Sequence, residues 1–164
     1  MIIYHGSNMV VEQPLILQSE RMLDFGIGFY TTPIKEQAIR WTEQIAKRRE
    51  PNTRILSIYE FDLESASRDL AIVRFAKPDG EWLDFVTDNR MGKEVAHPYD
   101  IVIGPVANDK VYSVVQFYEN GVYDKEEAIR RLKVEELFSQ ILFHSEKSLT
   151  YFRFTGCEHL GGTV

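Results

Sequence analysis

Apolar residues recur at helical spacing in several stretches of the chain, and the clearest stretch follows the Thr-Thr-Pro segment at 31–33. Ile34, Ala38, Trp41 and Ile45 are four, three and four residues apart, so they share one face of a helix. The preceding segment is expected to supply a capping hydroxyl and a proline at the first helical position. Similar spacing predicts shorter helices around residues 82–86, over 111–118 and from 124 to 132.

Strands are expected where apolar residues alternate with polar ones or form short runs between breakers. These patterns predict strands at residues 2–4, 29–30, 55–63, 100–104, 140–144 and 151–154. The strands are short and do not alternate regularly with helices, which indicates the α+β class rather than a wound parallel sheet. No internal repeat or Pro/Gly-rich linker divides the chain, so we expect a single domain over residues 1–164.

Composition narrows the class of protein further. The chain has 164 residues and a formal net charge of −6, which disfavours indiscriminate binding to nucleic-acid phosphates. A single cysteine, Cys157, excludes an internal disulfide and a cysteine-rich zinc site. His97, His144 and His159 show no ligand spacing, and we therefore expect no metal. No apolar run is long enough to span a membrane and no signal peptide is evident, so a cytoplasmic protein is expected.

The first candidate motif is His5-Gly6-Ser7, which comes where the first strand is expected to end. A histidine at this place can hydrogen-bond a ligand hydroxyl, and a glycine lets a ligand approach the backbone closely. The same three residues also fit a turn that ends a strand and holds a hydrogen-bonded histidine.

The second candidate motif is the Gly-Ile-Gly-Phe-Tyr-Thr-Thr run at 26–32. Two glycines allow the backbone to bend close to a ligand, and Tyr30 offers an aromatic face just after them. The run is neither the dinucleotide fingerprint nor a phosphate loop, because it lacks a third glycine and a Gly-Lys-Ser/Thr sequence. The alternative is a glycine turn that leads into two core strand residues.

In this order the two motifs resemble the ADP-ribosyltransferase superfamily, and more narrowly its diphtheria-toxin and poly(ADP-ribose)-polymerase branch, whose triad reads His–Tyr–Glu. Nearly the whole chain also resembles a bacterial family of unknown function placed in that superfamily, some of whose members neighbour antitoxin-like genes. The resemblance implies a split mixed or antiparallel sheet with flanking helices and NAD as co-substrate. It also implies a protein or nucleic-acid acceptor, and a toxin with an antitoxin protein as partner.

The resemblance implies a role for each matching residue. His5 would bond a ribose hydroxyl of the adenosine portion of NAD, while the Gly6 backbone and the Ser7 hydroxyl would hold the nicotinamide carboxamide. Tyr30 would stack on the nicotinamide ring, whose positive charge favours an aromatic face.

Two further residues complete the expected NAD-binding set. Gly28 lies in the glycine-containing motif, and Asn108 follows an expected strand and a Pro-Val-Ala turn. Asn108 can reach a cleft from that turn, and it also fits a helix cap.

The third triad position falls on Gln140, where related enzymes have glutamate. A glutamine cannot act as a general base, but it can accept a hydrogen bond from a ribose hydroxyl and hold the reacting sugar. Elongation of poly(ADP-ribose) is therefore not expected. The favoured hypothesis for the function is mono-ADP-ribosyl transfer. The alternatives are an inactive module that binds NAD, another nucleotide or a partner, and an NAD glycohydrolase. The rival positions are Gln116, in a Val-rich helical stretch, and Glu135 and Glu136 upstream of the strand.

Overall fold

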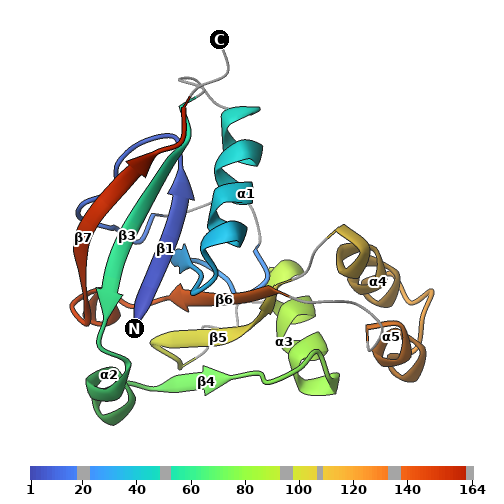
Figure 1. Cartoon of the computed structure of the whole chain (residues 1–164). Helices are drawn as coiled ribbons and strands as arrows, with labels where there is room; N and C mark the ends of the chain where they lie inside the picture. Colours follow the sequence, from blue (N-terminus) through green and yellow to red (C-terminus); the bar gives the residue numbers. More distant parts are fainter. Residues whose placement is uncertain (18–22, 49–52, 93–97, 107–108, 133–137, 162–164) are drawn as a thin grey trace.

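Two sheets form the centre of the fold, and the helices lie against them or beyond their edges (Figure 1). The computed structural model describes residues 1–17, 23–48, 53–92, 98–106, 109–132 and 138–161. The strands are β1 (Ile2–Ser7), β2 (Phe29–Thr31), β3 (Ile55–Phe61), β4 (Ile72–Arg74), β5 (Ile101–Val106), β6 (Phe138–Phe143) and β7 (Phe152–His159). The helices are α1 (Lys35–Ala46), α2 (Leu63–Asp69), α3 (Gly80–Arg90), α4 (Asp109–Glu119), α5 (Lys125–Leu132) and α6 (Glu146–Leu149).

Strand pairing separates the two sheets. The first has the order β1-β3-β7 and is antiparallel throughout, and the second has the order β2-β6-β5-β4. In the second sheet β4 and β5 are parallel and the other pairs are antiparallel. The expected α+β class, with antiparallel and mixed sheets, is therefore confirmed.

One backbone bridge joins β1 to the start of the segment after β2. The amide of Tyr4 donates to the carbonyl of Thr32 over 2.9 Å, and the amide of Thr32 donates back over 3.0 Å. The residues that follow Tyr4 and precede Thr32 are therefore held close together, although they belong to different sheets.

The register of the second sheet determines which side chains share a face. Tyr30 lies opposite Leu142 on β6, and Gln140 lies two residues before Leu142 on the same strand. Directly paired residues in an antiparallel sheet point to the same face, and so do residues two apart on one strand. Tyr30 and Gln140 therefore project from the same face of this sheet.

Two apolar clusters stabilise the two halves of the fold. One packs aromatic residues of both sheets together, and its fully buried members include Tyr59, Phe61 and Phe143. The other lies between the second sheet and helices α3 to α5, which stand together beyond the ends of its strands (Figure 1). Trp82 is fully buried there and its indole nitrogen donates to the carbonyl of Pro105 over 3.0 Å. Deep burial with this bond fixes α3 against β5.

Several local features differ from the sequence prediction. Helix α2, strand β4 and helix α6 were not expected, and β7 continues beyond the predicted end at Phe154. The predicted cap is wrong: Ile34 is the N-cap residue of α1 and makes no side-chain capping bond. The Thr32 hydroxyl instead accepts from the Ile34 amide and donates to the Ser139 carbonyl over 2.7 Å, which ties the segment to β6.

Two kinds of feature are absent from the described ranges. No helix there combines the length and apolar character that crossing a membrane requires. No three His, Cys, Asp or Glu side chains gather there in a way that would hold a metal ion.

Candidate functional site

A cavity of about 310 Å³ brings together residues of four strands (β1, β2, β5 and β6) and two helices (α1 and α3). It is lined by His5 and Gly6 of β1, Tyr30 of β2, Gln140 of β6, Trp41 and Ile45 of α1, Arg90 of α3, and Leu23, Asp24 and Val106. The three predicted triad positions thus line one cavity. A larger hollow of about 610 Å³ is lined by residues 1, 60–64 and 150–153 and contains none of the predicted site residues.

His5 is held in one tautomer by the backbone of β2. Its Nδ1 lies 2.8 Å from the Tyr30 carbonyl oxygen, which can only accept, so Nδ1 carries the hydrogen and donates. The ring nitrogen Nε2 then has a lone pair that can accept from a hydroxyl. Burial lowers the pKa of His5 below its usual value, an effect partly offset by the backbone bond to Tyr30. His5 is therefore a neutral acceptor at neutral pH.

This environment predicts a pH dependence of folding. Below about pH 6.5 His5 takes up a proton in the unfolded chain, whereas its lowered pKa keeps it neutral in the folded chain. The unfolded state therefore binds more protons. The free energy of unfolding should therefore fall as the pH drops below that value, and it should keep the full His5 contribution above it. Urea titrations between about pH 5 and 7 measure the slope, which should be flatter in His5→Gln.

The matched control is His159→Gln, which changes an exposed histidine on β7. It should keep the pH dependence of the wild-type protein. Equal slopes in wild type and His5→Gln would contradict the prediction.

Tyr30 contributes its ring to the cavity and its hydroxyl to the adjacent loop. The hydroxyl donates to the Gly26 carbonyl over 2.7 Å and accepts from the Phe25 amide over 3.2 Å. Burial raises the pKa of Tyr30 well above its usual range. The phenol therefore stays protonated and holds the loop, so Tyr30 can offer a ligand its aromatic face but cannot act as a base.

Gln140 is almost fully buried, with 3% of its surface exposed. Its Nε2 has no hydrogen-bond partner among the described residues. A buried donor without a partner lowers the stability of the folded state by about 1–3 kcal/mol, so an acceptor beside this atom would be favourable. An oxygen-bearing ligand in the cavity can supply one.

Gly6 has a structural reason of its own for lacking a side chain. A Cβ added there would lie 2.2 Å from the Ala38 carbonyl oxygen and 3.0 Å from Cγ2 of Thr42, both on α1. The glycine therefore allows α1 to approach β1 closely. The same approach brings Trp41 of that helix to the cavity wall.

Two of the predicted binding residues do not line the cavity. The Ser7 hydroxyl donates to the Met9 carbonyl over 2.6 Å, within a turn after β1. Gly28 packs against β6, where an added Cβ would lie 2.4 Å from the Phe143 carbonyl oxygen. Asn108 lies outside the described residues, as do Glu135 and Glu136.

Gln116, the rival glutamine, also lies elsewhere. It is exposed on α4, and its Nε2 lies 3.4 Å from the Tyr112 hydroxyl. Gln116 is not among the residues that line the 310 Å³ cavity, whereas Gln140 is.

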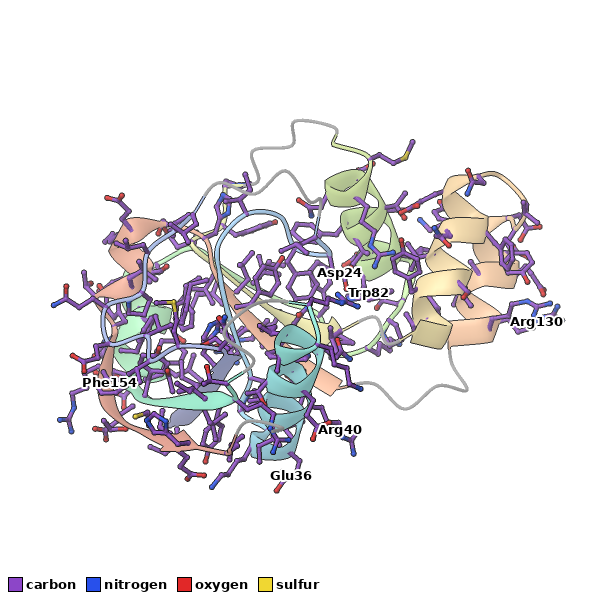
Figure 2. All side chains as sticks on the ribbon, turned by 90° about the horizontal axis from the view of Figure 1, so that it is seen from above. Asp24, Glu36, Arg40, Trp82, Arg130 and Phe154 are labelled. Atoms are coloured by element: carbon purple, nitrogen blue, oxygen red, sulfur yellow. The ribbon has the colours of Figure 1, made fainter. Side chains whose placement is uncertain are left out.

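An ion pair in the cavity wall was missed from the sequence. Arg90 Nη2 lies 2.6 Å from Asp24 Oδ1 and Nε lies 2.8 Å from the same oxygen, with only 12% and 11% of the two side chains exposed. The guanidinium also lies over the Tyr112 ring, 4.3 Å from its centroid. The partners are 66 residues apart in the chain, so no local pattern predicts them. Figure 2 shows Asp24 in the centre of the molecule, between the strands and α3.

The remaining wall is apolar. Leu23, Trp41, Ile45 and Val106 contribute to it. Trp41 and Ile45 belong to the apolar stripe that predicted α1, and spacing alone does not separate a core contact from a cavity wall. Together the wall offers an acceptor at His5, aromatic faces, an amide donor and a cation, which suits a flat ring joined to hydroxyl-bearing and anionic groups.

The comparisons with known proteins give a family. Residues 1–154 match the model of the family described as "Protein of unknown function (DUF3990)". No curated protein and no solved structure matches the chain. The expected match to a family of unknown function over nearly the whole chain is confirmed, and the link to ADP-ribosyltransferases stays a prediction. The chain belongs to the DUF3990 family.

Proposed function

We propose that this member of the DUF3990 family is an NAD-dependent mono-ADP-ribosyltransferase that modifies a protein or nucleic-acid acceptor. The observation that supports the proposal most is the convergence of His5, Tyr30 and Gln140, from β1, β2 and β6, on one cavity. These are the three positions that the resemblance implies, and 135 residues separate the first from the last (140 − 5). Motif matches that arose by chance would have no reason to meet in one cavity.

The residues of the cavity fit a nicotinamide–ribose group. The cavity volume of about 310 Å³ is at the lower end of ligand sites, which suits one ring and one sugar better than a whole dinucleotide. The unpaired Nε2 of Gln140 complements an oxygen of this sugar, and the lone pair on His5 Nε2 can accept from a ribose hydroxyl of the adenosine portion of NAD. When bound, NAD supplies a glycosidic bond whose leaving group, nicotinamide, departs with the bonding electron pair.

The proposed work of the protein is positioning. Tyr30 presents a ring face to the nicotinamide, Gly6 presents its backbone, and Gln140 holds the reacting ribose without a charge of its own. Holding two reactants in the reactive geometry accounts for a large part of many enzymatic rate enhancements. The acceptor nucleophile attacks the sugar carbon that nicotinamide leaves, and its proton passes to solvent.

The neutral Gln140 keeps two alternatives open. Without a carboxylate at this position the domain can bind NAD, another nucleotide or a partner protein without turnover. Water can also replace the macromolecular acceptor, which would make the protein an NAD glycohydrolase. The cellular role that we propose is that of a toxin whose antitoxin is a separate protein.

The direct test is incubation of the purified protein with NAD labelled in the adenylate portion, together with cell lysate. Label on a macromolecule with release of nicotinamide supports the transferase. Free labelled ADP-ribose identifies the glycohydrolase, and a thermal shift with NAD but no turnover identifies the binding module. Absence of both turnover and thermal shift would overturn the proposal.

The toxin role requires that expression alone stops growth and that co-expression of a neighbouring gene restores it.

A further inference from the structure

Two of the residues that line this cavity carry a buried hydrogen-bond donor without a partner. Arg90 Nη1 and Gln140 Nε2 are both buried, and neither has a hydrogen-bond partner among the described residues. Buried polar groups in folded proteins are nearly always paired, so two unpaired donors around one cavity require a common explanation. A ligand rich in acceptor oxygens provides it.

The guanidinium of Arg90 is already oriented by its neighbours. Nε and Nη2 donate to Oδ1 of Asp24, and the Tyr112 ring supports one face of the group. A guanidinium has five N–H donors in a fixed planar fork, and Asp24 uses one on each of two nitrogens. Nη1 makes no hydrogen bond among the described residues, so its two N–H donors stay available. This edge is rigid before any ligand binds, which lowers the entropic cost of binding.

The charges around Arg90 set the strength of the interaction. Asp24 balances the guanidinium, so the pair as a whole is close to neutral. A third group, Glu119, interacts electrostatically with the pair. Burial raises the pKa of its carboxyl group, the charge of Arg90 lowers that pKa, and the charge of Asp24 raises it. An anion that binds Arg90 must therefore share the guanidinium with Asp24. Removing the Asp24 charge should strengthen anion binding.

We propose that Arg90 is the anion-binding residue of this cavity and that it takes an oxygen of a nucleoside diphosphate. Planar guanidinium groups bind phosphate oxygens through charge-assisted hydrogen bonds, which are stronger than neutral ones. The choice of a diphosphate rests on the proposed function, because NAD carries one, whereas the anion site itself follows from Arg90. The nucleoside diphosphate extends from the small cavity past the Asp24–Arg90 pair.

The test compares ligands that differ only in phosphate, measured by calorimetry and by tryptophan fluorescence. Of the two tryptophans, Trp41 lines the cavity and Trp82 is fully buried. Wild type should bind ADP more tightly than adenosine. Arg90→Gln should lose about ten-fold in affinity for ADP, which corresponds to one charge-assisted hydrogen bond, and should bind adenosine and nicotinamide unchanged.

Two further variants separate an anion site from a purely structural ion pair. Asp24→Asn should bind ADP more tightly than wild type. The double variant Asp24→Asn/Arg90→Gln removes both charges, so it keeps the comparison possible if Arg90→Gln alone does not fold. Arg130→Gln is the matched control, because Arg130 is 75% exposed at the outer end of α5 (Figure 2).

The outcomes distinguish this inference from the proposed function. Equal losses for ADP, adenosine and nicotinamide in Arg90→Gln would show a structural role and overturn the inference, as would unchanged ADP binding. If nicotinamide is released from NAD and the release does not depend on Arg90, the proposed function holds and the inference about Arg90 fails. Arg90-dependent binding of ADP with no cleavage of NAD would leave the inference standing while the transferase fails.

Discussion

Gly6→Ala is expected to lower the free energy of unfolding by about 3 kcal/mol, the upper range for overpacked sites. The added methyl group would lie 2.2 Å from the Ala38 carbonyl oxygen, far inside van der Waals contact. That oxygen belongs to the backbone of α1, so it can move only if the helix moves. Urea denaturation of wild type and variant measures the difference.

Gly80→Ala is the matched control for this change. Its Cβ would also meet a close atom, Lys125 Cε at 2.7 Å, but this atom lies near the end of a flexible and partly exposed side chain. Gly80 is the first residue of α3, where alanine is a better helix former than glycine. Gly80→Ala should therefore change stability by less than about 1 kcal/mol. If the Gly6→Ala protein is as stable as wild type, the prediction is wrong and α1 can move away from β1 at little energetic cost.

The Gly6 result also bears on the site. Trp41 and Ile45 reach the cavity because α1 lies against β1, and Gly6 sets how close that approach is. A folded Gly6→Ala protein would therefore have a displaced cavity wall and weakened ligand binding. The sequence-based role for Gly6, backbone contact with a ligand, and its packing role against α1 are compatible, because Gly6 also lines the cavity.

Elements with regularly spaced apolar residues were predictable, whereas a short element was predictable only where a breaker marks its start, as Gly28 does for the three-residue strand β2. Helix α1 contains three of the four regularly spaced apolar residues, Ala38, Trp41 and Ile45, and this spacing specifies a face irrespective of its partner. Strand β4 has three residues and helix α6 has four, too few for either period to be recognised. The expected capping by Thr32 followed a valid local rule, but α1 begins only at Lys35, so the Thr32 hydroxyl accepts from the Ile34 amide before the helix and donates to the Ser139 carbonyl.

The site was predictable only where its residues stand in local motifs. His5 directly precedes Gly6, Tyr30 follows Gly28 by two residues, and Gln140 falls near the start of an apolar run that forms β6. Asp24 and Arg90 meet only because the loop before β2 packs against the end of α3. A pair made by tertiary packing leaves no periodic trace in the sequence, and a single sequence carries no other record of it.

Gln140→Ala should reduce nicotinamide release from NAD about 100-fold while NAD affinity falls less than about ten-fold. This prediction rests on the proposed function. The substitution leaves the Tyr30 ring in place and removes the amide that would hold the reacting ribose, so it affects the transition state more than the bound substrate. Steady-state nicotinamide release gives turnover, and calorimetry on the same protein gives affinity.

Gln140→Glu should keep or increase NAD cleavage, because it places a carboxylate of nearly the same shape where the ADP-ribosyltransferases that the sequence resembles have glutamate. The new carboxylate would be buried, with 3% of the native residue exposed, so the variant should lose stability and be measured well below its unfolding temperature. Gln116→Glu, on the exposed face of α4, is the matched control and should leave both turnover and stability unchanged. If Gln140→Ala and Gln140→Glu both cleave NAD at the wild-type rate, position 140 does not contact the reacting sugar. A carboxylate that restores cleavage lost in the alanine variant would instead assign position 140 as the third member of the triad.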